Sequence, residues 1–172
     1  EEIYVYMQTN YGTSVTPFYT TLALWVGGIV LVALMKVKVD YEDDEFKDAT
    51  EHQKYMGRAL LFLAMGQLQA LVVVLGDLYI LKIDCTHPFM LWLAAAITSF
   101  VFTLFIYTLV LTFGDLGKAI AVVMIVLQIA GSGGTYPIEL LPEFFQNVYL
   151  YFPFPYAINA MREAISGLYQ CD

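Results

Sequence analysis

Residues 88–113 read PFMLWLAAAITSFVFTLFIYTLVLTF, a stretch without a single Asp, Glu, Lys or Arg. A helix needs about 20 apolar residues to cross the hydrocarbon core of a bilayer, and this stretch exceeds that length. Two further stretches of comparable length, 15–35 and 59–81, are uncharged except for Asp77. The sequence therefore predicts an all-α protein, a polytopic bundle of transmembrane helices.

The composition agrees with a membrane protein and excludes several other classes. Of the 172 residues 59% are hydrophobic and 14% charged, whereas a soluble domain has about 25% charged residues. The net charge of −8 and the lack of a basic stripe exclude nucleic acid as a partner. Two cysteines, Cys85 and Cys171, are too few for a disulfide scaffold or a cysteine zinc site.

A fourth apolar segment is too short to cross in the same way. It follows the turn at 113–117 and reads as helix only over 118–130, before the run 131–134 of Gly-Ser-Gly-Gly. Its apolar part gives about 18 Å of helix against a core of about 30 Å. Either the helix continues through the glycines, or the chain stops at depth and re-enters. We expect the helix starts to be capped at Ser14 or Thr16, Thr86 and Asp115.

Basic residues predict the orientation of the bundle. The 36–58 segment holds five of the eight, and Lys118 falls on the same side if the spans alternate, against Lys82 and Arg162 opposite. Cytoplasmic loops carry the excess of Lys and Arg, so 36–58 is predicted to be cytoplasmic and the N-terminus outside.

Four polar side chains lie within the predicted helices: Gln67, Gln69, Asp77 and Gln128. Because a polar group facing lipid is costly, they should face the bundle interior or a water-filled path. The alternatives are that the glutamines link neighbouring helices by hydrogen bonds and that Asp77 reaches the interface. Small residues four apart should mark close helix contacts: Ala23/Gly27, Gly66/Ala70 and Ala95/Ser99.

No pattern predicts catalysis or a cofactor. The run at 131–135 lacks the Gly-Lys-Ser/Thr ending of a phosphate-binding loop, and His52 and His87 are predicted on opposite membrane faces. We expect no enzyme activity and no metal or other cofactor.

Two segments outside the long spans have features of their own. Aromatic residues crowd 144–156, as is typical of the membrane–water interface. The acidic part of the 36–58 segment is either a solvated loop or a short helix that contacts a cytoplasmic partner. The residues of that contact would be Asp43, Asp44, Glu45, Phe46 and Asp48.

Several motifs resemble the C-terminal membrane region of the YhgE/Pip (phage infection protein) family, which is similar to type-2 ABC permeases. The resemblance covers nearly the whole chain, and its most specific part is 127–142, LQIAGSGGTYPIELLP. The other matching segments are Asn10–Gly12, Pro17–Phe18, Leu24–Gly27, Gln67–Ala70, Leu75–Leu78, Phe113–Lys118 and Pro155–Ala164.

The resemblance implies an outer re-entrant hairpin ahead of a last span, with its bend at Gly131, Ser132, Gly133, Gly134 and Pro137. It also implies a span and a large extracellular domain before residue 1. The expected division is 1–14 extracellular lead-in, 15–35 helix, 36–58 cytoplasmic loop, 59–81 helix, 82–87 extracellular loop, 88–113 helix, 114–117 cytoplasmic turn, 118–130 membrane helix, and 131–172 outer hairpin and interfacial segment.

The function implied is that of a permease-class membrane part acting in export or at the cell surface, in the cell membrane of Gram-positive bacteria. The alternative is a non-transporting phage receptor or a membrane scaffold related to type VII secretion. Expected partners are the bilayer, a cytoplasmic ATPase, a second copy in a homodimer, and phage or secretion components. Cys85 and Cys171, both predicted outside, are either free or joined by a disulfide.

Overall fold

A computed structural model of the chain describes residues 11–37, 50–132 and 142–167. It confirms the all-α class, because the described residues contain helices and no strand. The long helices are α1 (Tyr11–Leu34), α2 (Glu51–Leu75), α3 (Pro88–Phe113) and α4 (Asp115–Gly131). A π-helical turn, Gly76–Ile80, extends α2, and the shorter elements are α5 (Glu143–Val148), the 3-10 turn Tyr149–Tyr151 and α6 (Pro153–Ser166).

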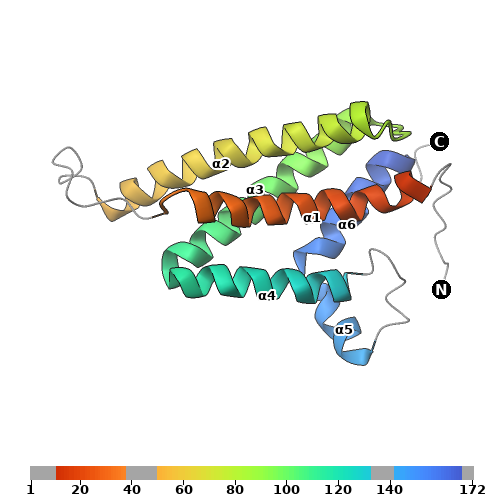
Figure 1. Ribbon diagram of the computed structural model, residues 1–172. Helices are drawn as coiled ribbons and strands as arrows, with labels where there is room; N and C mark the ends of the chain where they lie inside the picture. The colour runs from red at the N-terminus through yellow and green to blue at the C-terminus, as the bar shows by residue number, and fades with distance from the viewer. Residues whose placement is uncertain (1–10, 38–49, 133–141, 168–172) are drawn as a thin grey trace.

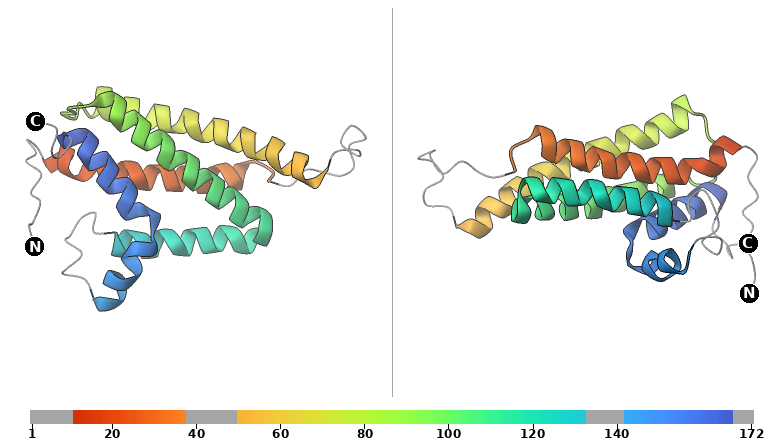
Figure 2. Two further views of the ribbon diagram at one scale, coloured as in Figure 1. Left: turned by 180° about the vertical axis from the view of Figure 1, so that it is seen from behind. Right: turned by 60° about the horizontal axis from the view of Figure 1, so that its bottom comes forward.

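The helices α1 to α4 run in alternating directions, so their connections gather at two ends of the bundle (Figure 1). One end holds the link between α1 and α2 and the turn between α3 and α4. The other end holds the link between α2 and α3, the start of α1 and the end of α6. Helix α6 runs back along the bundle against α3 and α1 (Figure 2).

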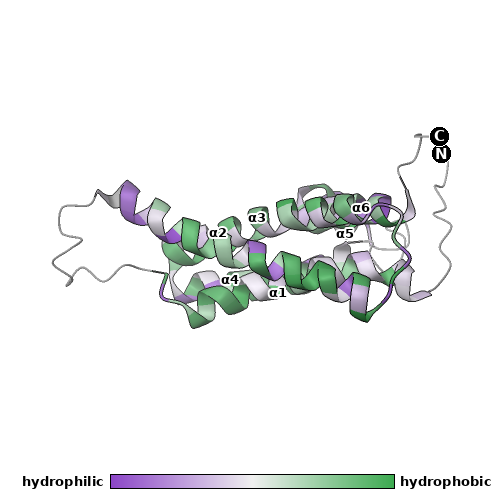
Figure 3. Cartoon of the chain, turned by 90° about the horizontal axis from the view of Figure 1, so that it is seen from above, coloured by the Kyte–Doolittle hydropathy of each residue, from purple (hydrophilic) through white to green (hydrophobic). Residues whose placement is uncertain are grey.

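Three of the described helices are long and apolar enough to cross a membrane: Tyr11–Leu34, His52–Ile80 and Pro88–Phe113. Apolar residues dominate their lengths, and hydrophilic ones lie at helix ends and at a few positions within the helices (Figure 3). Helix α4 has 17 residues, about 25 Å, which stays below the roughly 30 Å of a hydrocarbon core.

Helix α1 begins at Tyr11, four residues before the predicted span, and the predicted caps Ser14 and Thr16 are wrong. Pro17 lies inside the helix. The Thr16 and Thr21 hydroxyls donate to the carbonyls of Gly12 and Pro17, both at 2.8 Å. Lipid offers no hydrogen-bond partners for exposed backbone groups. A helix that continues through Pro17 therefore leaves fewer of these groups unpaired than a helix that stops there.

The other predicted caps also differ from the structure. Helix α2 begins at Glu51, inside the predicted loop 36–58, where Thr50 and Gln53 form a reciprocal capping box. Helix α3 has the predicted bounds, but His87 is its N-cap and Thr86 instead donates to the Ile165 carbonyl. Gly114, rather than Asp115, is the N-cap of α4.

The centre of the core is an aromatic cluster contributed by three helices. Trp25 of α1, Phe102 of α3 and Phe154 of α6 are at most 1% exposed, with ring centroids 4.9 to 5.6 Å apart. The indole of Trp25 also donates to the Ala121 carbonyl of α4 at 3.2 Å. The prediction that the aromatics of 144–156 lie at the interface is therefore wrong for Phe154, because α6 folds back into the bundle.

The predicted hairpin bend lies largely outside the described residues. Gly131 is the last residue of α4 and Ser132 follows it, both buried, while Gly133, Gly134 and Pro137 fall in the 133–141 range. The helix α6 had no counterpart in the expected division. The re-entrant hairpin stays a prediction.

Candidate functional site within the helix bundle

Two of the predicted glutamines link helices. Gln67 Nε2 donates to the Ala96 carbonyl of α3 at 3.0 Å, and Gln69 Nε2 donates to the Ala23 carbonyl of α1 at 3.2 Å. Each glutamine thus satisfies part of its amide on the backbone of a neighbouring helix. This arrangement matches the alternative in which the glutamines hold the bundle together.

Asp77 is buried between helices of the bundle. Its side chain is 7% exposed and accepts a hydrogen bond from the Thr20 hydroxyl of α1 at 2.6 Å. It stands in the π-helical turn that extends α2, a backbone feature found frequently at functional sites. Asp77 and Gln69 both face α1, two turns apart on α2.

Gln128 differs from the other three. It is fully buried on the α4 face that also carries Ala121 and Ile125, and neither side-chain atom of its amide has a hydrogen-bond partner among the described residues. The Trp25–Ala121 bond sets the antiparallel register of α1 and α4. Gln128 therefore lies two turns from that bond, at the level of the first half of α1.

The contacts of the described residues distribute these four side chains over several helix pairs. Gln67 belongs to the α2–α3 contact, Gln69 and Asp77 to the α2–α1 contact, and Gln128 to the inner face of α4. Two residues were missed. Thr20 and Thr21 are buried polar partners within α1, and a stripe of threonines at helical spacing (Thr13, Thr16, Thr20) was the signal that could have found that face.

The small-residue pairs form the predicted close contacts. Ser99 Oγ donates to the Gly66 carbonyl at 2.7 Å, and a Cβ on Gly66 would lie 2.6 Å from Thr103 Oγ1. A Cβ on Gly27 would overlap the amide of Gln69. The glycines therefore bring α2 close to α3 and α1, as expected for helices packed in lipid.

The predicted partner-contact residues (Asp43, Asp44, Glu45, Phe46 and Asp48) lie outside the described residues. What the structure describes is the pair of ends from which this segment departs. Val37, after α1, is 8% exposed, and Thr50 begins α2 with its capping box. Val37 lines a pocket together with Gly114 and Asp115 of the α3–α4 turn, and α2 begins at the same end of the bundle (Figure 1).

Cys85 stands beside the end of α6 at the opposite end of the bundle. Its thiol lies 3.5 Å from the Ala164 carbonyl, and burial raises the pKa of the thiol above its ordinary value. Cys85 has no disulfide partner among the described residues. Cys171, the other half of the predicted bridge, lies outside the described residues.

Within the described ranges no group of three or more His, Cys, Asp or Glu side chains is placed to hold a metal ion. The fold and these contacts define a class: a polytopic α-helical membrane protein whose polar side chains mainly link helices. Residues 52–170 match the family described as ABC-2 family transporter protein, and the chain belongs to this family.

A relative agrees with this assignment. The chain is 32% identical over 158 residues to the "Uncharacterized protein YhgE" of Bacillus subtilis (strain 168), which confirms the predicted relation to YhgE. The match covers 92% of this chain and 20% of the relative, so the chain spans about a fifth of that protein's length. No solved structure matches the chain. The protein is thus a transporter-like membrane component.

Proposed function

We propose that this chain is the membrane-embedded part of an exporter in the cell membrane, with a cytoplasmic ATPase as its energy source and no catalytic centre of its own. The observation that carries the proposal is the match to the ABC-2 transporter family over 52–170, which includes α2 to α6. Two copies side by side would form the working unit.

The distribution of charge supports a cytoplasmic position for the end that holds the α1–α2 link. Of the described basic residues, Lys36, Lys54, Arg58 and Lys118 belong to the elements of this end (Figure 1). Lys82 and Arg162 belong to the opposite end. Because positive residues are retained on the cytoplasmic side, the ATPase would meet the 36–58 segment.

The attachment of this segment to the bundle suits a coupling element. Val37 is buried against the core and Thr50 is tied to Gln53, so both ends of the 38–49 range are fixed to helices. A movement imposed there by a partner would act on α1 and α2 together. In the proposed contact Phe46 is the apolar anchor, and Asp43, Asp44, Glu45 and Asp48 face basic groups of the ATPase.

The test is the copurification of an ATPase with the full-length protein from mild detergent. Phe46→Ala should abolish copurification and export while leaving the membrane level unchanged. Phe113→Ala is the matched control, because Phe113 is an exposed phenylalanine at the same end, 52% exposed, outside the proposed contact. Reversing the four acids to lysine should weaken association in a salt-dependent way. Full function in both variants would remove the proposed coupling.

A second candidate function has its own support. Gln67 and Gln69 are engaged between helices, an arrangement that favours a sealed bundle over a polar path. In that case the helices anchor a receptor or a secretion scaffold, and phage or secretion components would bind parts of the protein outside this chain. Lack of any copurifying ATPase, together with surface function that survives Phe46→Ala, would favour this candidate.

A further inference from the structure

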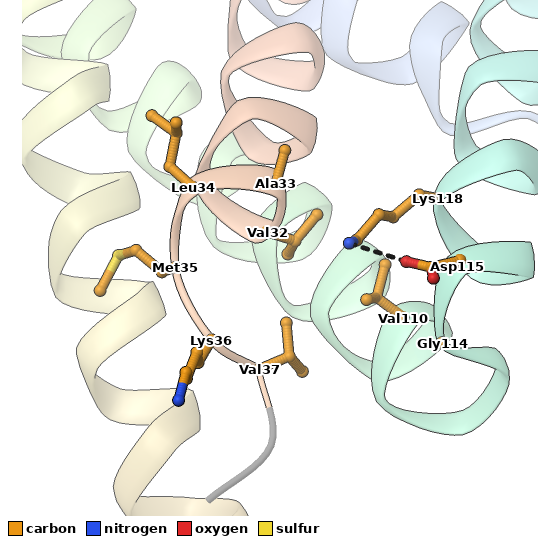
Figure 4. A pocket seen from close by; sticks show the side chains of 10 residues that line it. All are labelled: Val32, Ala33, Leu34, Met35, Lys36, Val37, Val110, Gly114, Asp115 and Lys118. Carbon is orange, nitrogen blue, oxygen red and sulfur yellow. Dashed lines mark hydrogen bonds and ion pairs between the residues drawn. The ribbon is translucent and has the colours of Figure 1, made fainter.

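A cavity of about 330 Å³ lies where α1 ends and α4 begins (Figure 4). It is within the size range of small-molecule sites. Its lining combines apolar side chains with charged ones: Val32, Ala33, Leu34, Met35, Lys36, Val37, Val110, Gly114, Asp115 and Lys118.

We call this cavity the end cavity. Its wall at the α3–α4 turn is closely packed. Gly114 turns the chain with a φ of 60°, and its amide donates to the Val110 carbonyl at 2.7 Å. A Cβ on Gly117 would lie 2.4 Å from the Leu109 carbonyl oxygen, so α4 starts in direct contact with α3. Val32 and Val110, on facing elements, are 2% and 4% exposed. The shape of the end cavity is therefore set by backbone packing.

The charge of the end cavity is suited to an anion. Lys118 points its amine into the space between α1 and α4, 3.0 Å from Asp115 (Figure 4). Asp115 is 97% exposed, so solvent weakens its hold on the lysine. Lys36 also lines the cavity, but its amine is directed away from Lys118, so Lys118 is the lysine that faces this space (Figure 4). The positive end of the α4 dipole, capped by no side chain, adds to this field.

Large apolar side chains are exposed at the same level. Leu34, Phe113 and Leu116 are 81%, 52% and 62% exposed at the ends of α1 and α3 and the start of α4. In a bilayer crossed by α1 and α3, both long enough to span one, these side chains would meet acyl chains near the edge of the hydrocarbon. In the same placement Lys118 would stand at the depth of the headgroups. A ligand for this place needs a phosphate and apolar chains together.

We propose that the end cavity binds a phospholipid, with the phosphate at Lys118 and the start of α4 and with acyl chains along Leu34 and Leu116. Lys118 and the positive end of the α4 dipole favour an anionic headgroup over a zwitterionic one, as in basic pockets between transmembrane helices. The proposal depends on the membrane placement of α1 and α3 and is independent of any transport. A lipid fits this cavity better than a cytoplasmic protein does, because exposed apolar side chains border the cavity.

The test measures lipids retained by the full chain in detergent, by native mass spectrometry, with phosphatidylglycerol or phosphatidylcholine added. The wild type should retain one phosphatidylglycerol in preference to phosphatidylcholine. Lys118→Gln should weaken this binding about fivefold, the effect of one basic residue near a membrane surface. Ala33→Phe, which fills the cavity without changing charge, should weaken it as well. Lys82→Gln, an exposed lysine at the opposite end, is the matched control and should bind as the wild type.

Circular dichroism and gel filtration establish that each variant folds. Should Lys118→Gln fail to fold, the lipid binding of Ala33→Phe tests the proposal. Wild-type binding by the cavity variants would overturn the proposal, as would an equal loss in Lys82→Gln. Displacement of the lipid by inorganic phosphate would make this a phosphate site and also overturn it. So would cavity variants that keep the lipid and lose a copurifying protein, because the cavity would then be a protein-docking site.

Discussion

Gln128 and Gln67 are both amides inside a helix bundle, but their surroundings differ. Gln67 donates to a carbonyl of the neighbouring helix, whereas both amide atoms of Gln128 are buried without a partner among the described residues. A buried polar group without a partner costs about 1–3 kcal/mol. An unpaired buried amide of this kind is expected where the group has a function that offsets its cost in stability.

Replacing the two glutamines by leucine should therefore have opposite effects. Gln128→Leu should raise the free energy of unfolding by about 1–3 kcal/mol, because it removes the unpaired amide. Gln67→Leu should lower it by about 0.6 kcal/mol, the average for a hydrogen bond between transmembrane helices. Thermal unfolding in detergent measures both. If Gln128→Leu destabilises the bundle, its amide has a partner such as a bound water. Loss of export in a stabilised Gln128→Leu would identify the amide as a functional contact.

Cys85 allows a test of pH dependence. Burial raises the pKa of its thiol, so the reactive thiolate forms at a higher pH than in an exposed cysteine. Alkylation of Cys85 without reductant should be slower than that of a cysteine placed at the exposed Lys82, and the difference should narrow between about pH 7 and pH 10. Each site is measured alone, with the other cysteines replaced by serine. Equal rates at all pH values would contradict the buried thiol. In the wild type, complete alkylation of Cys85 and Cys171 without reductant would exclude the bridge.

At the scale of the helices, the close approach of α2 to α3 at Gly66 depends on the absence of a side chain there. The Gly66 carbonyl accepts from Ser99, and no room is left for a side chain beside Thr103. Tyr107 supports the same contact further along, where its hydroxyl donates to the Tyr55 carbonyl at 3.2 Å. Close approach and hydrogen bonds thus replace the hydrophobic driving force that lipid removes.

Gly66→Val should destabilise the protein by about 1–3 kcal/mol, the usual cost of overpacking. Gly57→Val, in the same helix, should be neutral or slightly stabilising, because a Cβ there meets nothing within 4 Å and glycine is a poor helix former. The shared substitution makes the helix-propensity change the same in both. Thermal unfolding and the yield of monodisperse protein are the measurements. Equal destabilisation at the two positions would show that packing is not the cause.

For the whole molecule, most of the described basic residues lie at one end of the bundle, and the assignment of the two ends to membrane sides can be tested. In a background with Cys85 and Cys171 replaced by serine, cysteines at Glu45 and Thr135 should label from opposite sides of intact cells. Position 45 should be protected from impermeant reagents. Cysteines at the exposed His52 and Glu143, on described elements, provide matched controls for the same two sides. Equal labelling at both members of either pair would contradict the predicted orientation.

The helical class and the 88–113 span were predictable from sequence, because apolar run length is a local property compared with a fixed bilayer thickness. Helix starts were predicted less well. At Pro17 the helix continues although proline favours a helix start, whereas at Thr50 a local capping box sets the start of α2. The sequence alone does not indicate which of these two outcomes a given start signal has. The relation to YhgE also followed from local motifs.

The partners of the buried side chains were decided by tertiary packing. Phe154 has the sequence surroundings of an interfacial aromatic, yet the return of α6 places it against Trp25 and Phe102. Likewise, Gln67 is paired and Gln128 is not, although both are glutamines in apolar helices. The physical reason is that the pattern along one helix determines that a polar group must be buried. Only the helix that packs opposite determines whether a hydrogen-bond partner meets it.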